Sequence, residues 1–113
     1  MRVIYVAGKY KAPTEWELVQ NIRHAEEVAR RLWAEGWVVI CPHMNTAHWG
    51  GLLEDPEEDH LLWLRGDLEL VKRCDAIYML NNWDKSSGAR SEHELALKLK
   101  KEIIYENQNE NKR

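Results

Sequence analysis

The sequence predicts a single-domain α/β fold, a doubly wound parallel sheet with helices on both faces. Short apolar segments alternate with longer segments whose apolar residues recur every three or four positions, a pattern typical of strands and amphipathic helices in turn. Four such strands are separated by three helices, and 113 residues suffice for one domain with a modest core. Right-handed crossovers then give a Rossmann-like or flavodoxin-like sheet with the strand order 2-1-3-4.

The first half of the chain supplies two strands and one helix. Residues 2–7 form a compact β-branched and aromatic run, typical of a buried central strand. Thr14, with a glutamate three positions later, has the pattern of a capping box and predicts a helix start. Gly36 suits the end of this helix, and residues 37–41 form the second strand. The face of this helix expected to be buried contains Leu18, Ile22, Ala25, Ala29 and Leu32.

The second half supplies the other helices and strands. A long irregular loop is expected over residues 43–60, and loops of this length in a compact domain tend to be functional. It runs into a helix from about Pro56 to Arg73, with strands at residues 76–80 and 102–105. Between these strands the pattern predicts a helix from Ser87 to about Lys100. The second helix is expected to bury Leu61, Leu64, Leu68 and Val71.

Composition narrows the class of protein. The net charge of −3 and the interspersed charges argue against a general nucleic-acid binder. No apolar run approaches the roughly 18 residues of a membrane span, and no signal peptide is apparent, so we expect a cytoplasmic protein with Cys41 and Cys74 reduced. Six tryptophans without phenylalanine suggest a pocket or a subunit contact, and we expect a homo-oligomer, a dimer or larger. The domain is expected over residues 1–106, followed by a polar tail, 107–113.

The candidate site lies where the third strand leads into the last helix. Ser86 or Ser87 can cap that helix, and Gly88 allows close approach of backbone or ligand. Glu92 heads a helical series completed by Leu95, Ala96 and Leu99, so a carboxylate stands on the face that a helix buries. In the predicted strand order, this loop meets Gly8, at the end of the first strand, at the switch point of the sheet.

Asp67 is a second carboxylate on or beside an apolar stripe, between Leu64 and Val71. Two carboxylates partly removed from water suit cleavage of a glycosidic bond, since one can attack or stabilise the anomeric carbon while another group handles the leaving-group proton. Two structural interpretations compete with this one. Glu92 could lie at a pocket rim, solvated or paired with Arg90 or His93, and Asp67 could cap a loop or pair with Arg65 or Arg73.

Three segments together resemble the nucleoside 2-deoxyribosyltransferase superfamily, including its short relatives and the deoxynucleoside 5′-monophosphate N-glycosidases. The first is Ile4-Tyr5-Val6-Ala7-Gly8, similar to the first strand of that family. The second is Asp67-Leu68 followed by Cys74-Asp75-Ala76, similar to the family's Asp-Leu helix and the strand entry after it. The third is Ser86-x-Gly88-x-x-x-Glu92, similar to its Gly-x-x-x-Glu motif. With the matching element order, the resemblance covers essentially the whole chain.

The resemblance implies cleavage or transfer at the N-glycosidic bond of a 2′-deoxynucleoside or its 5′-monophosphate. Glu92 would be the nucleophile, and Tyr5 would hold its carboxylate. Asp67 would orient the sugar or manage the proton delivered to the departing base. Ser86 and Gly88 would contact the 5′ end of the substrate. No metal and no organic cofactor is implied, and the partner would be a small-molecule nucleoside or nucleotide, without nucleic acid or membrane.

Other contacts follow from the residue pattern and from departures from the family. The N–H groups at the start of the Ser87 helix could hold a phosphate or a sugar hydroxyl. Lys9, after Gly8, stands where the phosphate-hydrolysing branch has a serine. Lys9, Lys11 or Arg90 could replace that phosphate contact, or each could lie solvated. The fourth strand is the last element expected in these residues, so we expect the pocket, the oligomer contact or both to differ from those of longer members. Trp49 in the long loop is expected to stack on the base.

Three other interpretations remain open. The residues His43, His48, His60, Cys41 and Asp59 could be metal ligands, although their spacing fits no standard zinc pattern. A small Rossmann-like domain could bind a nucleotide without turning it over, with Glu92 accepting a hydrogen bond from ribose. The same pocket could instead cleave the glycosidic bond of NAD or a ribonucleotide.

Overall fold

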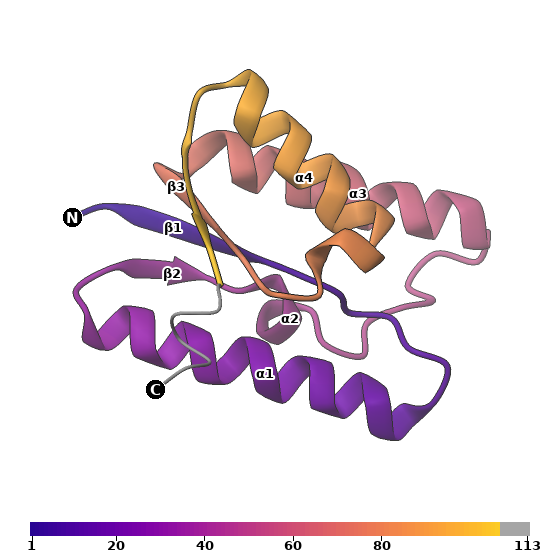
Figure 1. Cartoon of the computed structure of the whole chain (residues 1–113). Helices are drawn as coiled ribbons and strands as arrows, with labels where there is room; N and C mark the ends of the chain where they lie inside the picture. Colours follow the sequence, from indigo (N-terminus) through magenta and orange to yellow (C-terminus); the bar gives the residue numbers. More distant parts are fainter. Residues whose placement is uncertain (107–113) are drawn as a thin grey trace.

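A computed structural model describes residues 1–106 and has the predicted α/β architecture (Figure 1). All four predicted strands and the three long helices are present, so the fold class is confirmed. The elements in chain order are β1 (Val3–Ala7), α1 (Glu15–Ala34), β2 (Val38–Ile40), α2 (Pro42–Asn45), α3 (Pro56–Arg73), β3 (Ala76–Met79), a short 3₁₀ helix η1 (Trp83–Lys85), α4 (Ser87–Lys98) and β4 (Glu102–Tyr105). The polar tail expected at residues 107–113 lies outside the described residues.

The sheet is parallel throughout and has the predicted order β2-β1-β3-β4. β1 lies between β2 and β3, with Tyr5 opposite Ile40 on one side and Ile77 on the other. β2 is therefore added on one side of β1, and β3 and β4 are added on the other side. This reversal creates a crevice at the carboxyl ends of β1 and β3, where open α/β sheets bind ligands.

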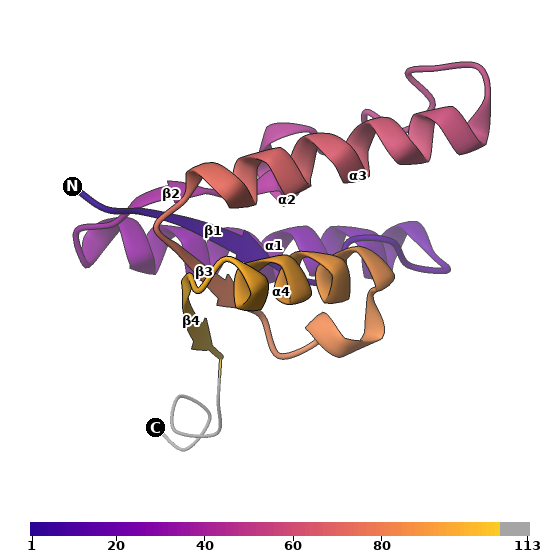
Figure 2. The ribbon, with the colours of Figure 1, turned by 90° about the horizontal axis from the view of Figure 1, so that it is seen from above.

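Helices cover both faces of the sheet, with α1 on one face and α3 and α4 on the other (Figures 1 and 2). The alternation of β1 divides its residues between two cores: Ile4 and Val6 face α1, whereas Tyr5 and Ala7 face α3 and α4. On the α1 side, the helix buries Ala25, Val28, Ala29 and Leu32. Leu18 and Ile22, also predicted to be buried, are only partly buried. They lie in the first half of α1, before the four residues that the helix buries.

The helix ends follow the predicted signals. The Thr14 hydroxyl accepts a hydrogen bond from the Glu17 N–H at 3.2 Å, as expected for the start of α1. Gly36 has a φ of +103°, the left-handed conformation that glycine adopts readily after a helix. α4 ends at Lys98, two residues earlier than predicted, and Leu99 is 43% exposed instead of buried. The loop predicted over residues 43–60 begins with the short helix α2, which four residues cannot signal through periodicity.

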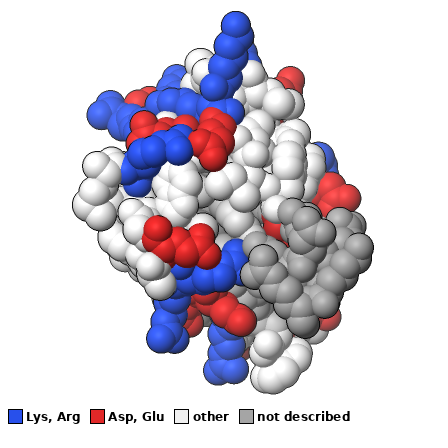
Figure 3. All heavy atoms as spheres, turned by 60° about the vertical axis from the view of Figure 1, so that its left-hand side comes forward, with Lys and Arg blue, Asp and Glu red and all other residues white. Residues whose placement is uncertain are grey.

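The surface in Figure 3 carries charges of both signs, with Lys and Arg beside Asp and Glu. Within residues 1–106, no helix combines the length and apolar character needed to cross a bilayer. Glu106, directly after the carboxyl end of β4, connects this strand to α1 and to the loop after β3. Its carboxylate accepts the Asn81 N–H at 2.8 Å and pairs with His24 at 3.0 Å.

Candidate active site

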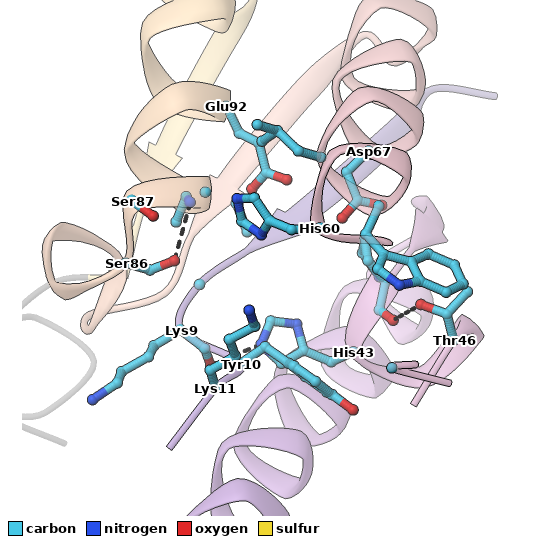
Figure 4. Close-up of a pocket in the computed structure, with 18 of the residues that line it drawn as sticks. Lys9, Tyr10, Lys11, His43, Thr46, His60, Asp67, Ser86, Ser87 and Glu92 are labelled. Carbon is cyan, nitrogen blue, oxygen red and sulfur yellow. Dashed lines mark hydrogen bonds between the residues drawn. The ribbon is translucent and has the colours of Figure 1, made fainter. Parts of the chain in front are cut away.

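A cavity of about 670 Å³ opens at the carboxyl end of β1, between α3 and α4. Its lining comes from five parts of the chain: β1 with the loop after it, α2, the segment between α2 and α3, α3 itself, and the end of η1 with the first half of α4. Figure 4 shows Glu92 and Asp67 on one side of this cavity, with the His60 ring below Glu92 in this view. Lys9, Tyr10, Lys11 and His43 lie across from them in the same view.

Glu92 is buried, with 6% of its surface exposed. It lies on the face of α4 that packs on the sheet, one turn before Ala96 in the core. The Tyr5 hydroxyl donates a hydrogen bond to Glu92 Oε2 at 2.6 Å, joining β1 to α4 across 87 residues. Arg90 instead donates to the Asp84 carbonyl, and His93 contacts the Tyr105 hydroxyl, so neither forms the rim pair that the sequence left open.

The surroundings of Glu92 change its acidity. Burial raises the pKa of Glu92 from 4.5 to about 8; the hydrogen bond from Tyr5 acts in the opposite direction, and the charge of Asp67 adds to the rise. Burial also raises the pKa of Tyr5 well above its usual value, with the Glu92 charge as the next cause. Tyr5 therefore remains a hydrogen-bond donor throughout the neutral and mildly alkaline pH range.

Asp67 lies on the cavity face of α3, and burial raises its pKa to about 6. Its charge acts on both Glu92 and Tyr5, which brings the three predicted catalytic residues into one electrostatic group. Arg73, a partner considered from the sequence, instead pairs with Glu69 at 2.9 Å. Two carboxyl groups with pKa values raised by burial are a combination that marks candidate acid–base and nucleophile sites.

The first turn of α4 forms another wall of the cavity. Ser86 is the N-cap residue, and its hydroxyl accepts the Ala89 N–H at 3.1 Å. The N–H groups of Ser87 and Gly88 belong to the turn in which a helix has no internal acceptor for them. All three of the residues predicted here, Ser86, Ser87 and Gly88, line the cavity. The partial positive charge of a helix N-terminus suits an anionic or hydroxyl group of a ligand.

Gly8 and Lys9 line the cavity at the end of β1. A Cβ on Gly8 would lie 2.5 Å from Leu80 Cδ1, so the close approach that requires glycine is to the end of β3. The Lys9 N–H donates to Asn82 Oδ1 at 2.9 Å, and the Lys9 carbonyl accepts from His43 Nε2 at the same distance. The backbone of Lys9 thus joins the loops that follow β1, β2 and β3.

Trp49 does not line the cavity, in contrast to the position expected from the sequence. It is 55% exposed, and its ring meets the ring of Trp63 edge-on, with centroids 6.4 Å apart. Trp63 on α3 is the tryptophan in the lining. The sequence could not distinguish them, because the path of the loop that contains Trp49 and leads to the helix of Trp63 is not encoded by periodicity. Lys11, considered from the sequence as a phosphate contact, lies in the lining. Lining residues that the sequence did not single out as substrate contacts include Tyr10, His43, Thr46, His60 and Trp63.

His43 is buried beside Tyr10, whose ring is 5.6 Å away. Burial lowers its pKa, and its Nε2 donates to a carbonyl, so the ring is the neutral tautomer with a lone pair on Nδ1. Within residues 1–106, no three His, Cys, Asp or Glu side chains group closely enough to hold a metal ion. The five possible ligands considered from the sequence therefore do not form a cluster.

Comparisons with known proteins agree with this architecture. A family model described as "Domain of unknown function (DUF4406)" matches residues 2–105. A solved structure described as the 2-deoxyribosyltransferase of the psychrotolerant bacterium Bacillus psychrosaccharolyticus aligns with a TM-score of 0.61 and 24% sequence identity. The alignment covers 91% of this chain and 70% of that chain, and at this identity it shows a shared fold. No curated protein sequence matches the chain.

Proposed function

The chain belongs to the DUF4406 family, and we propose that it cleaves or transfers at the N-glycosidic bond of a 2′-deoxynucleoside or its 5′-monophosphate. Glu92 is the proposed nucleophile. The proposal is supported by the fold shared with a protein described as a 2-deoxyribosyltransferase. It also includes a cytoplasmic location and assembly as a homo-oligomer.

The observation that carries the proposal is the buried Glu92 carboxyl held by Tyr5 at 2.6 Å inside a cavity of about 670 Å³. A cavity of this size accommodates a nucleoside-sized ligand. The Tyr5 hydrogen bond fixes the orientation of the carboxyl group and leaves Oε1 for the substrate. A positive charge developing at C1′ of the sugar stabilises the ionised form of Glu92 most where water is excluded.

In the first step, Glu92 as a carboxylate attacks C1′ while the bond from C1′ to the base nitrogen breaks. The electron pair of that bond leaves with the base, and a protonated Asp67 supplies the proton that neutralises it. Burial raises the pKa of Asp67 to about 6, so part of the population holds this proton near neutral pH. The product is a glycosyl ester of Glu92 and a free base.

In the second step, water or a second base attacks C1′ of the ester and releases the Glu92 carboxylate. Asp67 accepts the proton from the incoming group, which restores the starting state. Water gives hydrolysis, and a base gives transfer. The N–H groups of Ser87 and Gly88 are proposed to hold the 5′ hydroxyl or phosphate, and Lys9 is proposed to act near that group.

A second candidate function is nucleotide binding without turnover. The observation that favours it is the pKa of Glu92, which burial raises to about 8, so the carboxyl group is mainly protonated near neutral pH. A protonated Glu92 can donate a hydrogen bond to a ribose hydroxyl instead of attacking C1′. This module would bind a nucleotide in the same cavity and leave it intact.

A substrate panel tests the proposal directly. The protein is incubated with deoxynucleosides, their 5′-monophosphates, ribonucleosides and NAD, each with and without a second base, and free-base release and base exchange are followed. We expect release or exchange with a deoxy substrate and a loss on the order of 1,000-fold in kcat for Glu92→Gln. Glu94→Gln, an exposed position on the same helix, is the matched control and should retain activity.

The outcomes separate the candidate functions. Turnover of ribonucleosides or NAD alone would move the assignment to another sugar. Binding of a nucleotide by calorimetry without release from any member of the panel would support the binding module. Full activity of Glu92→Gln would exclude Glu92 as the nucleophile.

A further inference from the structure

Asp59, at the start of α3, is a buried carboxylate whose two oxygens are both engaged. It is 8% exposed. Oδ1 accepts the Leu53 N–H at 2.9 Å, and Oδ2 accepts the Gly51 N–H at 2.9 Å. Oδ2 also accepts the indole N–H of Trp63 at 3.2 Å. One side chain therefore holds the segment before α3 and a tryptophan one turn further along the helix.

These contacts distinguish Asp59 from the other carboxyl groups of the cavity. The N–H groups of Leu53 and Gly51 lower the pKa of Asp59, whereas burial raises the pKa values of Asp67 and Glu92. Asp59 thus stays ionised and accepts hydrogen bonds from three donors. These are the properties of a group that orders its neighbours, not of one that exchanges protons with a substrate.

The residues that Asp59 holds form one wall of the cavity. Gly51, Leu53 and Trp63 all belong to its lining. Trp49, outside the lining, packs edge-on against Trp63, so the indole is held at its N–H by Asp59 and at one edge by a second ring. An aromatic ring fixed in this way offers a rigid face at little loss of conformational entropy on binding.

The order of residues on α3 indicates what this wall contacts. Asp59, Trp63 and Asp67 follow one another at intervals of four residues, so they lie along one side of the helix. Asp67, in the proposed reaction, protonates the departing base. A base within reach of Asp67 therefore lies beside Trp63, one helical turn away.

We propose that Trp63 is the platform on which the planar base packs, and that Asp59 is a positioning residue that orients this platform and residues 51–53. This inference rests on the proposed function for the identity of the ligand, a nucleobase on a sugar. It assigns the stacking role to Trp63 in place of Trp49.

The test compares Asp59→Asn, Trp63→Ala and the control Asp55→Asn. Asp55 is an exposed N-cap residue of the same helix, and Asn is an equally good cap. An amide at position 59 presents N–H groups to donors that need an acceptor, so the Trp63 ring loses its fixed position. The binding probes are adenine and thymine as free bases, and 2-deoxyribose 5-phosphate as a sugar without a base, measured by calorimetry. With an active substrate, kcat and KM are measured as well.

We expect Trp63→Ala to weaken binding of the free bases roughly 10- to 100-fold, as for other base–aromatic stacks. Asp59→Asn should weaken it on the order of 10-fold, because the loss of hydrogen bonds to a charged group loosens the ring. KM for a nucleoside should rise by similar factors with kcat little changed, since stacking acts equally on ground and transition states. Binding of 2-deoxyribose 5-phosphate should be unchanged in all variants.

The results distinguish failure of this inference from failure of the proposed function. Wild-type affinity for bases in Asp59→Asn and Trp63→Ala, or a Trp49→Ala variant that alone loses base binding, would overturn the inference. Equal loss of base and sugar binding in Asp59→Asn would reduce Asp59 to a general structural role. Weakened base binding in both variants, with no turnover of any substrate by wild type, would support the platform and refute the enzyme.

Discussion

Glu92 combines two properties that oppose each other at the level of a single residue. Its position on the buried face of α4 removes it from water, which suits the proposed role as a nucleophile that stabilises a positive charge. The same burial raises the pKa of Glu92 to about 8, so the folded chain binds a proton that the unfolded chain releases. Burial of Glu92 therefore reduces the stability of the fold around neutral pH.

The stability of the protein should depend on pH through this residue. Since the folded pKa of Glu92 is about 8 and its usual value is 4.5, the unfolding free energy contributed by this group falls as pH rises between those values. Glu92→Gln should remove this dependence and stabilise the protein by a few kcal/mol above pH 8, because a tenfold change in proton affinity corresponds to about 1.4 kcal/mol. Urea unfolding of both proteins at pH 5 and pH 9 measures this difference in unfolding free energy. An equal gain in stability at the two pH values would contradict the prediction.

The pH dependence of activity should identify the two carboxyl groups. In the proposed reaction, the productive form has Glu92 ionised and Asp67 protonated, so kcat/KM should be highest between about pH 6 and pH 8, the pKa values of the two groups. Asp67→Asn should abolish the fall at high pH. The remaining activity should rise with the ionisation of Glu92 alone, at a pKa below 8, because the Asp67 charge no longer raises it.

Tyr5→Phe should shift the pKa of Glu92 in the direction opposite to Asp67→Asn. The Tyr5 hydrogen bond lowers the pKa of Glu92, so removing the hydroxyl should move the pKa of Glu92 upward. The effect is read from the same profile of kcat/KM against pH, with protein folding checked by circular dichroism. A Glu92 pKa that moves in the same direction in Tyr5→Phe and Asp67→Asn would contradict the electrostatic arrangement described for this site.

At the scale of elements, the strands and long helices could be predicted from the sequence, because apolar periodicity and capping residues mark them. The strands and long helices were placed within about two residues because apolar spacing, Thr14 and Gly36 mark them. The sequence could not predict α2, which is too short for a period, or the path of the segment held by Asp59, which depends on hydrogen bonds between side chain and distant backbone. For the same reason Trp49 and Trp63 were indistinguishable before the fold was known.

Two glycines of the cavity differ in the space around them: Gly8 lies against the end of β3, whereas Gly88 does not. Gly8→Ala should lower stability by about 1–3 kcal/mol, because a Cβ there would lie 2.5 Å from the Leu80 side chain and force the ends of β1 and β3 apart. Gly88→Ala is the matched control: its new Cβ meets only the Ser86 hydroxyl, at 3.9 Å, and its helical position favours alanine by up to about 1 kcal/mol. Thermal or urea unfolding compares them. Equal effects of the two changes would show that the contact with Leu80 has no special role.

At the scale of the molecule, exposed tryptophans are the feature that bears on assembly. Trp16 is 70% exposed and Trp33 is 51% exposed, at opposite ends of α1. Large apolar side chains on a surface often mark protein contacts. We predict a dimer or larger species by size-exclusion chromatography with light scattering. Changing Trp16 or Trp33 to Glu should shift the protein toward monomer if that residue lies in the contact. A monomer at every concentration would refute the proposed oligomer.

The order in which the chain is synthesised gives the central position of β1 a further consequence. β1 is made before both of its partners, yet β3 lies more than 70 residues later, and the Tyr5–Glu92 bond spans 87 residues. Pairing over such distances in sequence is slow, because a long loop must close before any contact forms. During translation, one side of β1 therefore stays open until β3 has left the ribosome, and the cavity can form only afterwards. The same strand that places Tyr5 at the centre of the site makes the nascent chain dependent on late residues for its protection from aggregation.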